Sequence, residues 1–126
     1  MNGIQKKMTK PSETYRPGDV IVIPFPYTDN IEKSKRRPAV VLSEGKRFNV
    51  DTGQLVCAMI TSSKSSSWPY DVKITDLKAA GLVNPCVIRM KLFTIDQRFV
   101  LRRAGCLCEF DGRAVFESLR LTLGVV

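Results

Sequence analysis

The residues with the clearest chemical potential crowd the entrance to one apolar run. Lys33, Lys35, Arg36 and Arg37 place four cations within five positions, directly before Pro38 and the apolar sequence AVVL. Cations this close repel one another unless an anion comes to meet them. The run therefore indicates a surface that binds an anion, although a solvated loop without a partner is the plain alternative.

A second group of candidate residues lies further along the chain. Trp68, the only tryptophan, stands in a serine-rich stretch (62–70) with Lys64, and its ring could stack on an unpaired base. Packing of that ring into the core is an equal alternative. Arg89 alternates with apolar neighbours in the run 86–95, so it either faces solvent from a half-buried strand or contacts a nucleic acid.

The residue types that are missing or scattered limit the chemistry further. The chain has no histidine, which removes the usual general base of a nuclease. Cys106 and Cys108 form a C-x-C pair, yet no second Cys or His pair lies at zinc-site spacing, so we expect no metal and no cofactor. All four cysteines stand in apolar segments, which favours reduced, packed thiols over disulfides.

Composition and charge narrow the choice of partner. The 126 residues suit one domain, 44% of them are hydrophobic, and twenty Lys and Arg against twelve Asp and Glu leave a net charge of +8. Such a balance, with a pI near 9.6, favours polyanions, of which nucleic acid is the commonest. No apolar run approaches the roughly 20 residues of a membrane span and no signal peptide is recognisable, so we expect a cytoplasmic protein.

The hydrophobic pattern predicts a mainly β fold of the α+β type, with a flexible N-terminal arm (1–14) before a single domain (15–126). Residues 28–37 indicate a long loop, and Pro24 and Pro26 require a sheet edge or a bulge. Short strands followed by a helix predict a small β-barrel with helices laid on it. The expected strands are 20–27, 38–43, 54–61, 71–74, 86–95 and 98–107, with a helical turn at 75–82.

The C-terminal segment 110–126 differs in kind from the strands. Val115, Leu119 and Leu123 recur at helical spacing, which predicts an amphipathic helix with these side chains on its buried face. Asp111 is the expected N-cap of this helix, and Gly124 is the expected stop.

Four segments, taken in order, resemble the MazF/PemK family of toxin ribonucleases. They are RPGDVIVIPF (16–25), RRPAVVLS (36–43), CAMITSSK (57–64) and CVIRMKLFTID (86–96), so the resemblance covers about residues 16 to 124. It implies an SH3-like barrel of the CcdB/MazF-like kind, a symmetric homodimer, and an acidic antitoxin as partner. The implied activity is that of an mRNA interferase. Such an enzyme cleaves single-stranded RNA without a metal, by attack of the 2′-hydroxyl on its own phosphate to leave a 2′,3′-cyclic phosphate.

The resemblance also assigns roles to residues. The family's essential arginine falls on Arg37, its essential threonine on Thr61, and an acidic residue five positions before the arginine on Glu32. Arg37 would donate to the phosphate, Thr61 would hold it in line, and Glu32 would act as base or positioning group. We expect further RNA-binding contacts from Lys35, Arg36, Ser43, Lys64, Trp68 and Arg89.

Two departures from the family's pattern leave other functions open. Met90 and Lys91 follow Arg89 where some members carry an acid and a glutamine, and IEKSKR replaces a short glycine-containing loop before the Arg-Pro pair. Thr61 can also be an ordinary strand end, and Glu32 a surface ion-pair partner. The alternatives are a non-catalytic SH3-like module that binds RNA or protein, and an inactive toxin relative that still binds an antitoxin.

Overall fold

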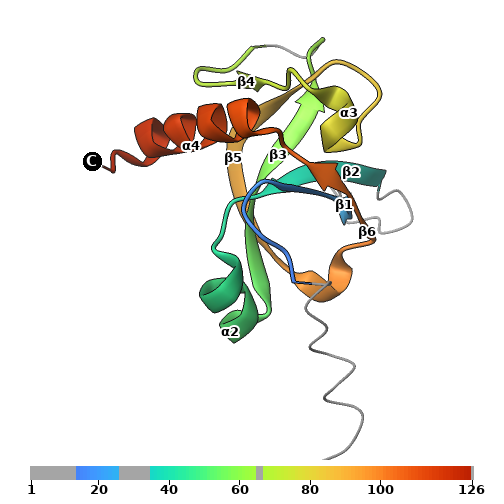
Figure 1. The fold of residues 1–126 in the computed structure, drawn as a ribbon, viewed down its shortest axis with the longest axis vertical. Coiled ribbons are helices and arrows are strands. Elements are labelled where there is room, and N and C mark those ends of the chain that lie inside the picture. The colour runs from blue at the N-terminus through green and yellow to red at the C-terminus, as the bar shows by residue number, and fades with distance from the viewer. Residues whose placement is uncertain (1–13, 26–34, 65–66, 126) are drawn as a thin grey trace, which may run out of the picture.

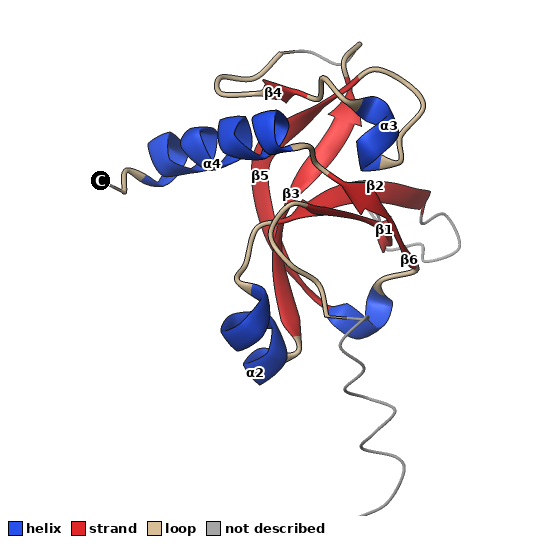
Figure 2. Cartoon of the chain, in the orientation of Figure 1, coloured by secondary structure: helices blue, strands red, loops and turns tan. Residues whose placement is uncertain are grey.

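A curved antiparallel sheet of six strands forms the frame of the protein. The computed structural model describes residues 14–25, 35–64 and 67–125. The strands follow the spatial order β4-β5-β3-β2-β1-β6, and the sheet curls into an open half-barrel (Figure 1). Their bounds are β1 (Asp19–Phe25), β2 (Lys35–Val41), β3 (Gln54–Ser62), β4 (Val72–Lys73), β5 (Cys86–Asp96) and β6 (Arg102–Cys106). The predicted mainly β fold with short helices is confirmed (Figure 2).

Short helical segments surround this sheet in the described part of the chain. α4 lies against β4 and β5, and α3 lies against β6, so both helices cover the same end of the half-barrel (Figure 1). The expected strand 98–107 is shorter than predicted, because the Asp96 carboxylate accepts a hydrogen bond from the Arg98 N–H and turns the chain first. The helical segments are η3 (Gly45–Asn49), α2 (Val50–Thr52), α3 (Leu77–Ala80), η4 (Gln97–Phe99) and α4 (Glu109–Leu123).

The basic run begins β2 rather than ending a loop. β2 starts at Lys35, so the prediction of a loop over 28–37 is wrong for its last three residues. These residues pair with the end of β1, from Ile23↔Arg37 to Phe25↔Lys35. Charge does not prevent this pairing, because the side chains of a strand stand away from its backbone ladder. Arg37 is therefore held by a strand on a fixed frame.

The prolines of β1 and β2 lie where each strand has one neighbour. β6 pairs with β1 only over Asp19–Val22, short of Pro24, and β3 pairs with β2 only over Ala39–Val41, just past Pro38. A proline lacks an N–H and is tolerated where one side of the ladder is open. The edge position expected for Pro24 is confirmed, and Pro26 lies outside the described residues.

Both faces of the central strands are buried. Because successive strand residues point to opposite faces, β1, β2 and β3 feed two apolar clusters. One cluster joins the sheet to the helices, with Val40, Ile60 and Val115 at its centre. The other contains Ile23 and Cys57, and burial raises the pKa of the Cys57 thiol to about 12. This double burial makes the strand ends rigid supports for side chains.

The N-terminal cap of α4 differs from the prediction, and its C-terminal end agrees with it. The Cys108 thiol, not Asp111, caps the helix by accepting the Asp111 N–H. The buried Asp111 carboxylate instead accepts hydrogen bonds from the Thr75 N–H at 3.0 Å, the Thr75 hydroxyl at 2.7 Å and the Asp76 N–H at 3.1 Å. Gly124, with φ +70°, ends the helix as predicted.

Two further expectations for the C-terminal part fail. Leu123 is 56% exposed rather than buried, because the last turn of α4 extends past the sheet (Figure 1). Cys106 is exposed rather than packed, since β6 is an edge strand.

Among the described residues, no helix is long and apolar enough to cross a membrane. The proposed arm, residues 1–14, lies outside the described residues except for Thr14.

Candidate functional site

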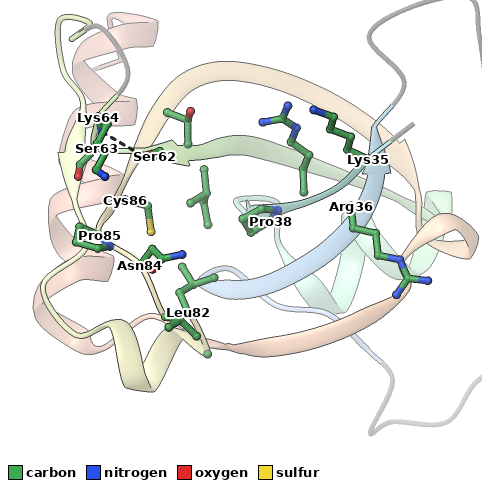
Figure 3. Close-up of a pocket in the computed structure, with 15 residues that line it drawn as sticks. Lys35, Arg36, Pro38, Ser62, Ser63, Lys64, Leu82, Asn84, Pro85 and Cys86 are labelled. Atoms are coloured by element: carbon green, nitrogen blue, oxygen red, sulfur yellow. Dashed lines mark hydrogen bonds between the residues drawn. The ribbon is translucent and has the colours of Figure 1, made fainter. Parts of the chain in front are cut away.

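A hollow of about 830 Å³ opens between the start of β2, the end of β3 and the segment that joins α3 to β5. In Figure 3, Lys35 and Pro38 stand on one side, and Lys64 stands on the other beside Pro85 and Cys86. We call it the basic hollow. Its lining consists of Lys35, Arg36, Arg37, Pro38, Ile60, Thr61, Ser62, Ser63, Lys64, Gly81, Leu82, Val83, Asn84, Pro85 and Cys86.

A second hollow of about 410 Å³ lies on the other side of Arg37 and Thr61. Phe25 and Phe93 meet in it with ring centroids 5.3 Å apart, so we call it the aromatic hollow. Arg37 and Thr61 line both hollows and form the ridge between them. Its lining consists of Phe25, Arg37, Met59, Thr61, Arg89, Lys91, Leu92 and Phe93.

Strand register explains why Arg37 and Thr61 meet. β2 and β3 pair as Ala39↔Met59, and the same antiparallel register continued by two residues sets Arg37 opposite Thr61. Neither residue belongs to the part of β2 and β3 that is paired with each other. Both side chains therefore stand where these two strands separate and the hollows open. Two residues that are 24 positions apart in the sequence thus lie close together, and each is part of a strand that continues into the core.

Three cations that line the basic hollow form no ion pair with another described residue. No carboxylate lines either hollow among the described residues, and the ion pairs between described residues do not include Lys35, Arg36 or Lys64. Lys35 and Arg36 are exposed, and Arg36 points away from Lys35 (Figure 3). Concave surfaces lined by one sign of charge concentrate the opposite charge. The basic hollow is therefore suited to phosphate groups.

Arg89 in the aromatic hollow is instead paired within the protein. Its Nε and Nη2 donate to the two carboxylate oxygens of Asp71 at 3.1 and 2.8 Å, and the side chains are only 9% and 14% exposed. The backbone N–H of Trp68 donates to the same carboxylate at 3.0 Å. Burial acts to raise the pKa of Asp71, but the hydrogen bonds from Arg89 and Trp68 outweigh it and hold that pKa below its usual value.

The Trp68 ring lies beside two cations. The Cζ of Arg89 and the Nζ of Lys91 stand 5.5 and 5.0 Å from the ring centroid. Both distances are within the range of cation–π attraction. The ring is 41% exposed, so the prediction that it packs into the core is not met, and its role in stacking a base stays a prediction.

The predicted site residues divide into four groups, of which Ser43 is the last. Arg37, Thr61, Lys35, Arg36 and Lys64 meet in the basic hollow. Arg89 lines the aromatic hollow, with Trp68 against it, and Glu32 lies outside the described residues.

Ser43 lies apart from the other predicted site residues. It stands six residues beyond Arg37, or about 20 Å along an extended chain, and lines neither hollow. Its hydroxyl is bound to Asn49 and to the Val56 N–H. The geometry therefore gives no support to an RNA contact at Ser43.

Sequence reasoning missed Lys91 and the aromatic pair. Met59 pairs with Arg89 while the adjacent Ala58 pairs with Leu92, so Met90 and Lys91 form a bulge in β5. Arg89 and Lys91, on either side of Met90 at this irregularity, both line the aromatic hollow. The i, i+2 spacing of Arg89 and Lys91 was the only local signal that they share a hollow.

Among the described residues, no group of three His, Cys, Asp or Glu side chains could hold a metal ion.

Comparison with known sequences gives one match. The family model described as "PemK-like, MazF-like toxin of type II toxin-antitoxin system" matches residues 16–123, which include both sides of each hollow. No curated protein sequence matches the chain.

Several solved structures share the fold. The MazE–MazF complex (Form-III) of Deinococcus radiodurans matches with a TM-score of 0.71 and 21% identity, over 90% of this chain and 99% of that chain. An endoribonuclease in complex with its cognate antitoxin, from a mycobacterial species, gives 0.71 and 15%, over 89% and 97%. Mycobacterium tuberculosis toxin MazF-mt6 gives 0.62 and 20%, over 88% and 99%.

Proposed function

Because the chain belongs to the PemK-like, MazF-like toxin family of type II toxin–antitoxin systems, we propose that it is an endoribonuclease that cuts single-stranded RNA. The observation that carries this proposal is the ridge of Arg37 and Thr61 between the basic hollow and the aromatic hollow. A phosphate on that ridge would have cationic contacts on one side and space for a base on the other. Unpaired strands expose bases that can be held in this way, which supports a cut within single-stranded RNA.

The proposed reaction uses the RNA's own nucleophile. The 2′-hydroxyl oxygen forms a bond to the adjacent phosphorus as the bond from phosphorus to the 5′-oxygen breaks, which leaves a 2′,3′-cyclic phosphate and a 5′-hydroxyl. One proton leaves the 2′-oxygen and one reaches the 5′-oxygen. Arg37 cannot accept the first proton, because a guanidinium presents only N–H donors and no acceptor. Its guanidinium donates instead to the phosphate oxygens, on which negative charge grows.

Thr61 and a general base complete the mechanism. The Thr61 hydroxyl donates to the same phosphate and fixes the angle of attack. Glu32 remains our candidate for the base, five positions before Arg37 in the sequence. Lys35, Arg36 and Lys64 would bind the phosphates on either side of the cut, a contact that depends on charge and not on base identity.

The proposed partners follow from the family and, for the antitoxin, from the same charge. Related structures hold a MazF with a MazE, and an endoribonuclease with its cognate antitoxin. We propose that an acidic antitoxin covers the basic hollow of this chain, and that the chain forms a homodimer. Binding of such a peptide would compete with RNA, because both need Lys35 and Lys64.

The test is cleavage of single-stranded RNA in EDTA, with the fragment ends identified by mass spectrometry. Wild type should give 2′,3′-cyclic phosphate ends. Arg37→Ala should lose about 100-fold or more in cleavage rate, as expected for removal of one donor to a developing anion. Arg102→Ala is the matched control, since it removes the same charge from an exposed site on β6, and it should cut at the wild-type rate.

Two results would overturn the proposal. One is the absence of any cleavage by the wild type, and the other is equal cleavage by wild type and Arg37→Ala. Binding of RNA that stays intact would favour the alternative of a non-catalytic RNA-binding module.

A further inference from the structure

The aromatic hollow has an apolar floor and a cationic rim. Phe25, Met59, Leu92 and Phe93 supply the apolar surface, and Arg89 and Lys91 stand beside them. Its volume of about 410 Å³ lies within the range of small-molecule sites, about 300–1,000 Å³. Apolar and aromatic surface of this kind takes up the flat face of a nucleobase. The hollow begins at Arg37 and Thr61, so a base within it would belong to a nucleotide next to the phosphate on the ridge.

The rim offers hydrogen-bond donors and few acceptors. Arginine and lysine side chains only donate, and among the described residues of the rim Thr61 alone has a side-chain oxygen. Guanine and uracil present keto oxygens, which accept. Adenine and cytosine present amino groups at the matching positions, which donate and would meet another donor. The rim therefore distinguishes keto bases from amino bases by the direction of the hydrogen bond.

The donors of the rim are held in place. Asp71 binds Arg89 through two hydrogen bonds, and the Trp68 ring lies against both Arg89 and Lys91. The Ser118 hydroxyl of α4 donates to the carbonyl of Tyr70 at 2.6 Å and ties this loop to the helix. A donor that is fixed before binding selects among ligands better than one that must be ordered on binding. Trp68 and Asp71 are thus positioning residues for the rim.

We propose that the aromatic hollow accepts a keto base, uracil or guanine, of the nucleotide next to the scissile phosphate, and that Lys91 selects it. This inference rests on the proposed function, because the phosphate on the ridge locates the base. It adds the site that gives a cut its sequence preference. The basic hollow, which contacts phosphates, would contribute none of that preference.

Binding of uncleavable RNA tests the hollow separately from the cutting reaction. Short single-stranded oligonucleotides with 2′-O-methyl sugars keep the bases and lack the nucleophile. Two matched pairs isolate the keto group, namely uracil against cytosine and hypoxanthine against adenine. Trp68 is the chain's only tryptophan and lies against Lys91, so its fluorescence reports binding at the rim. We expect the keto member of each pair to bind about tenfold more tightly, as for one well-placed polar contact to a base edge.

Lys91→Glu tests the residue that selects. It replaces a donor by an acceptor at an exposed position, so the ratio of affinities should invert towards cytosine and adenine. Lys64→Glu carries the same change of charge into the basic hollow and is the matched control. It should weaken binding of all four oligonucleotides alike and leave the ratios unchanged.

The outcomes distinguish a failure of the keto-base site from a failure of the proposed enzyme. Equal affinities within both wild-type pairs, or ratios that Lys91→Glu leaves unchanged, overturn the keto-base site even if Arg37-dependent cleavage is found. A keto preference in binding, without cleavage of any RNA, supports the site and removes the proposed enzyme. If the wild type binds none of the four oligonucleotides, the keto-base site is overturned as well. Should Lys91→Glu fail to fold, the wild-type ratios still decide.

Discussion

The two hollows share Arg37 and Thr61, yet they differ in how the protein treats its own cations. In the basic hollow, Lys35 and Lys64 are exposed and belong to none of the ion pairs between described residues. In the aromatic hollow, Arg89 is locked by Asp71 and lies against a tryptophan ring. Loose cations attract any phosphate, whereas fixed donors can discriminate one base edge from another.

The difference suggests a division of labour across the ridge. One side would bind the strand irrespective of sequence, and the other would decide where the strand is cut. A site that relied on loose cations alone would bind without choosing. The same chain meets both needs because Lys35 and Lys64 line one hollow while Arg89 and Lys91 line the other.

Breaking the ion pair should damage the aromatic hollow alone. Asp71→Asn leaves the Arg89 guanidinium largely buried without its counter-charge, and we expect a loss of about 2 kcal/mol in the free energy of unfolding. The keto preference should disappear, while the salt dependence of RNA binding stays as in wild type. Urea unfolding and oligonucleotide titration measure the two effects.

The control for this variant is Glu109→Gln, which removes an exposed ion pair with Arg113 on α4. It should leave the unfolding midpoint unchanged, because pairs in solvent contribute little. An equal loss in the two variants would show that Asp71 is no more than another surface carboxylate.

Acid should weaken the ion pair that holds Arg89 in the aromatic hollow. The pKa of Asp71 is lower in the folded protein than the value of about 3.9 for an unfolded chain, so the folded state binds fewer protons. Its contribution to stability is therefore complete above about pH 4 and declines as the pH falls through the folded pKa. Asp111 has a lowered pKa as well, because hydrogen bonds from Thr75 and Asp76 outweigh its burial.

Unfolding followed between about pH 5 and pH 2 should thus show a steep loss of stability in wild type. The loss should be smaller in Asp71→Asn, which has no proton to take up at that position. Identical pH profiles for the two proteins would contradict the assignment of Asp71.

Salt should affect the two sides unequally. Lys64→Ala removes a proposed phosphate contact, so the slope of log affinity against log salt should fall by about one. Lys91→Ala removes a contact to a base, and the slope should change by much less. Titrations of one RNA at several salt concentrations measure both slopes, and equal changes would place Lys91 on the backbone path.

Sequence reasoning reached the ridge because its residues are local signals. Arg37 precedes a proline at a strand entrance and Thr61 ends an apolar run, so both lie in segments that could be matched to the family in order, and the resemblance then selected them. The amphipathic helix and its Gly124 stop were likewise readable from a repeat of three to four residues.

The walls of the hollows could not be read in this way. The Asp71–Arg89 pair and the bulge at Met90 and Lys91 depend on how β3, β4 and β5 align, which no local pattern sets. The wall after α3 depends on Gly81, whose φ is +75° and where an added Cβ would come within 2.0 Å of the Ala104 carbonyl oxygen. Only the folded chain brings such pairs together.

The most direct test of the ridge as a cutting site uses an RNA with one altered sugar. After wild-type cut sites are mapped in EDTA, a single 2′-deoxynucleotide replaces the residue on the 5′ side of one site. This site should no longer be cut while the other sites are cut as before, and Arg37→Ala should cut none of them appreciably. Undiminished cleavage at the deoxy site would contradict the proposed reaction, because the strand would then be cut by a nucleophile other than its own 2′-hydroxyl.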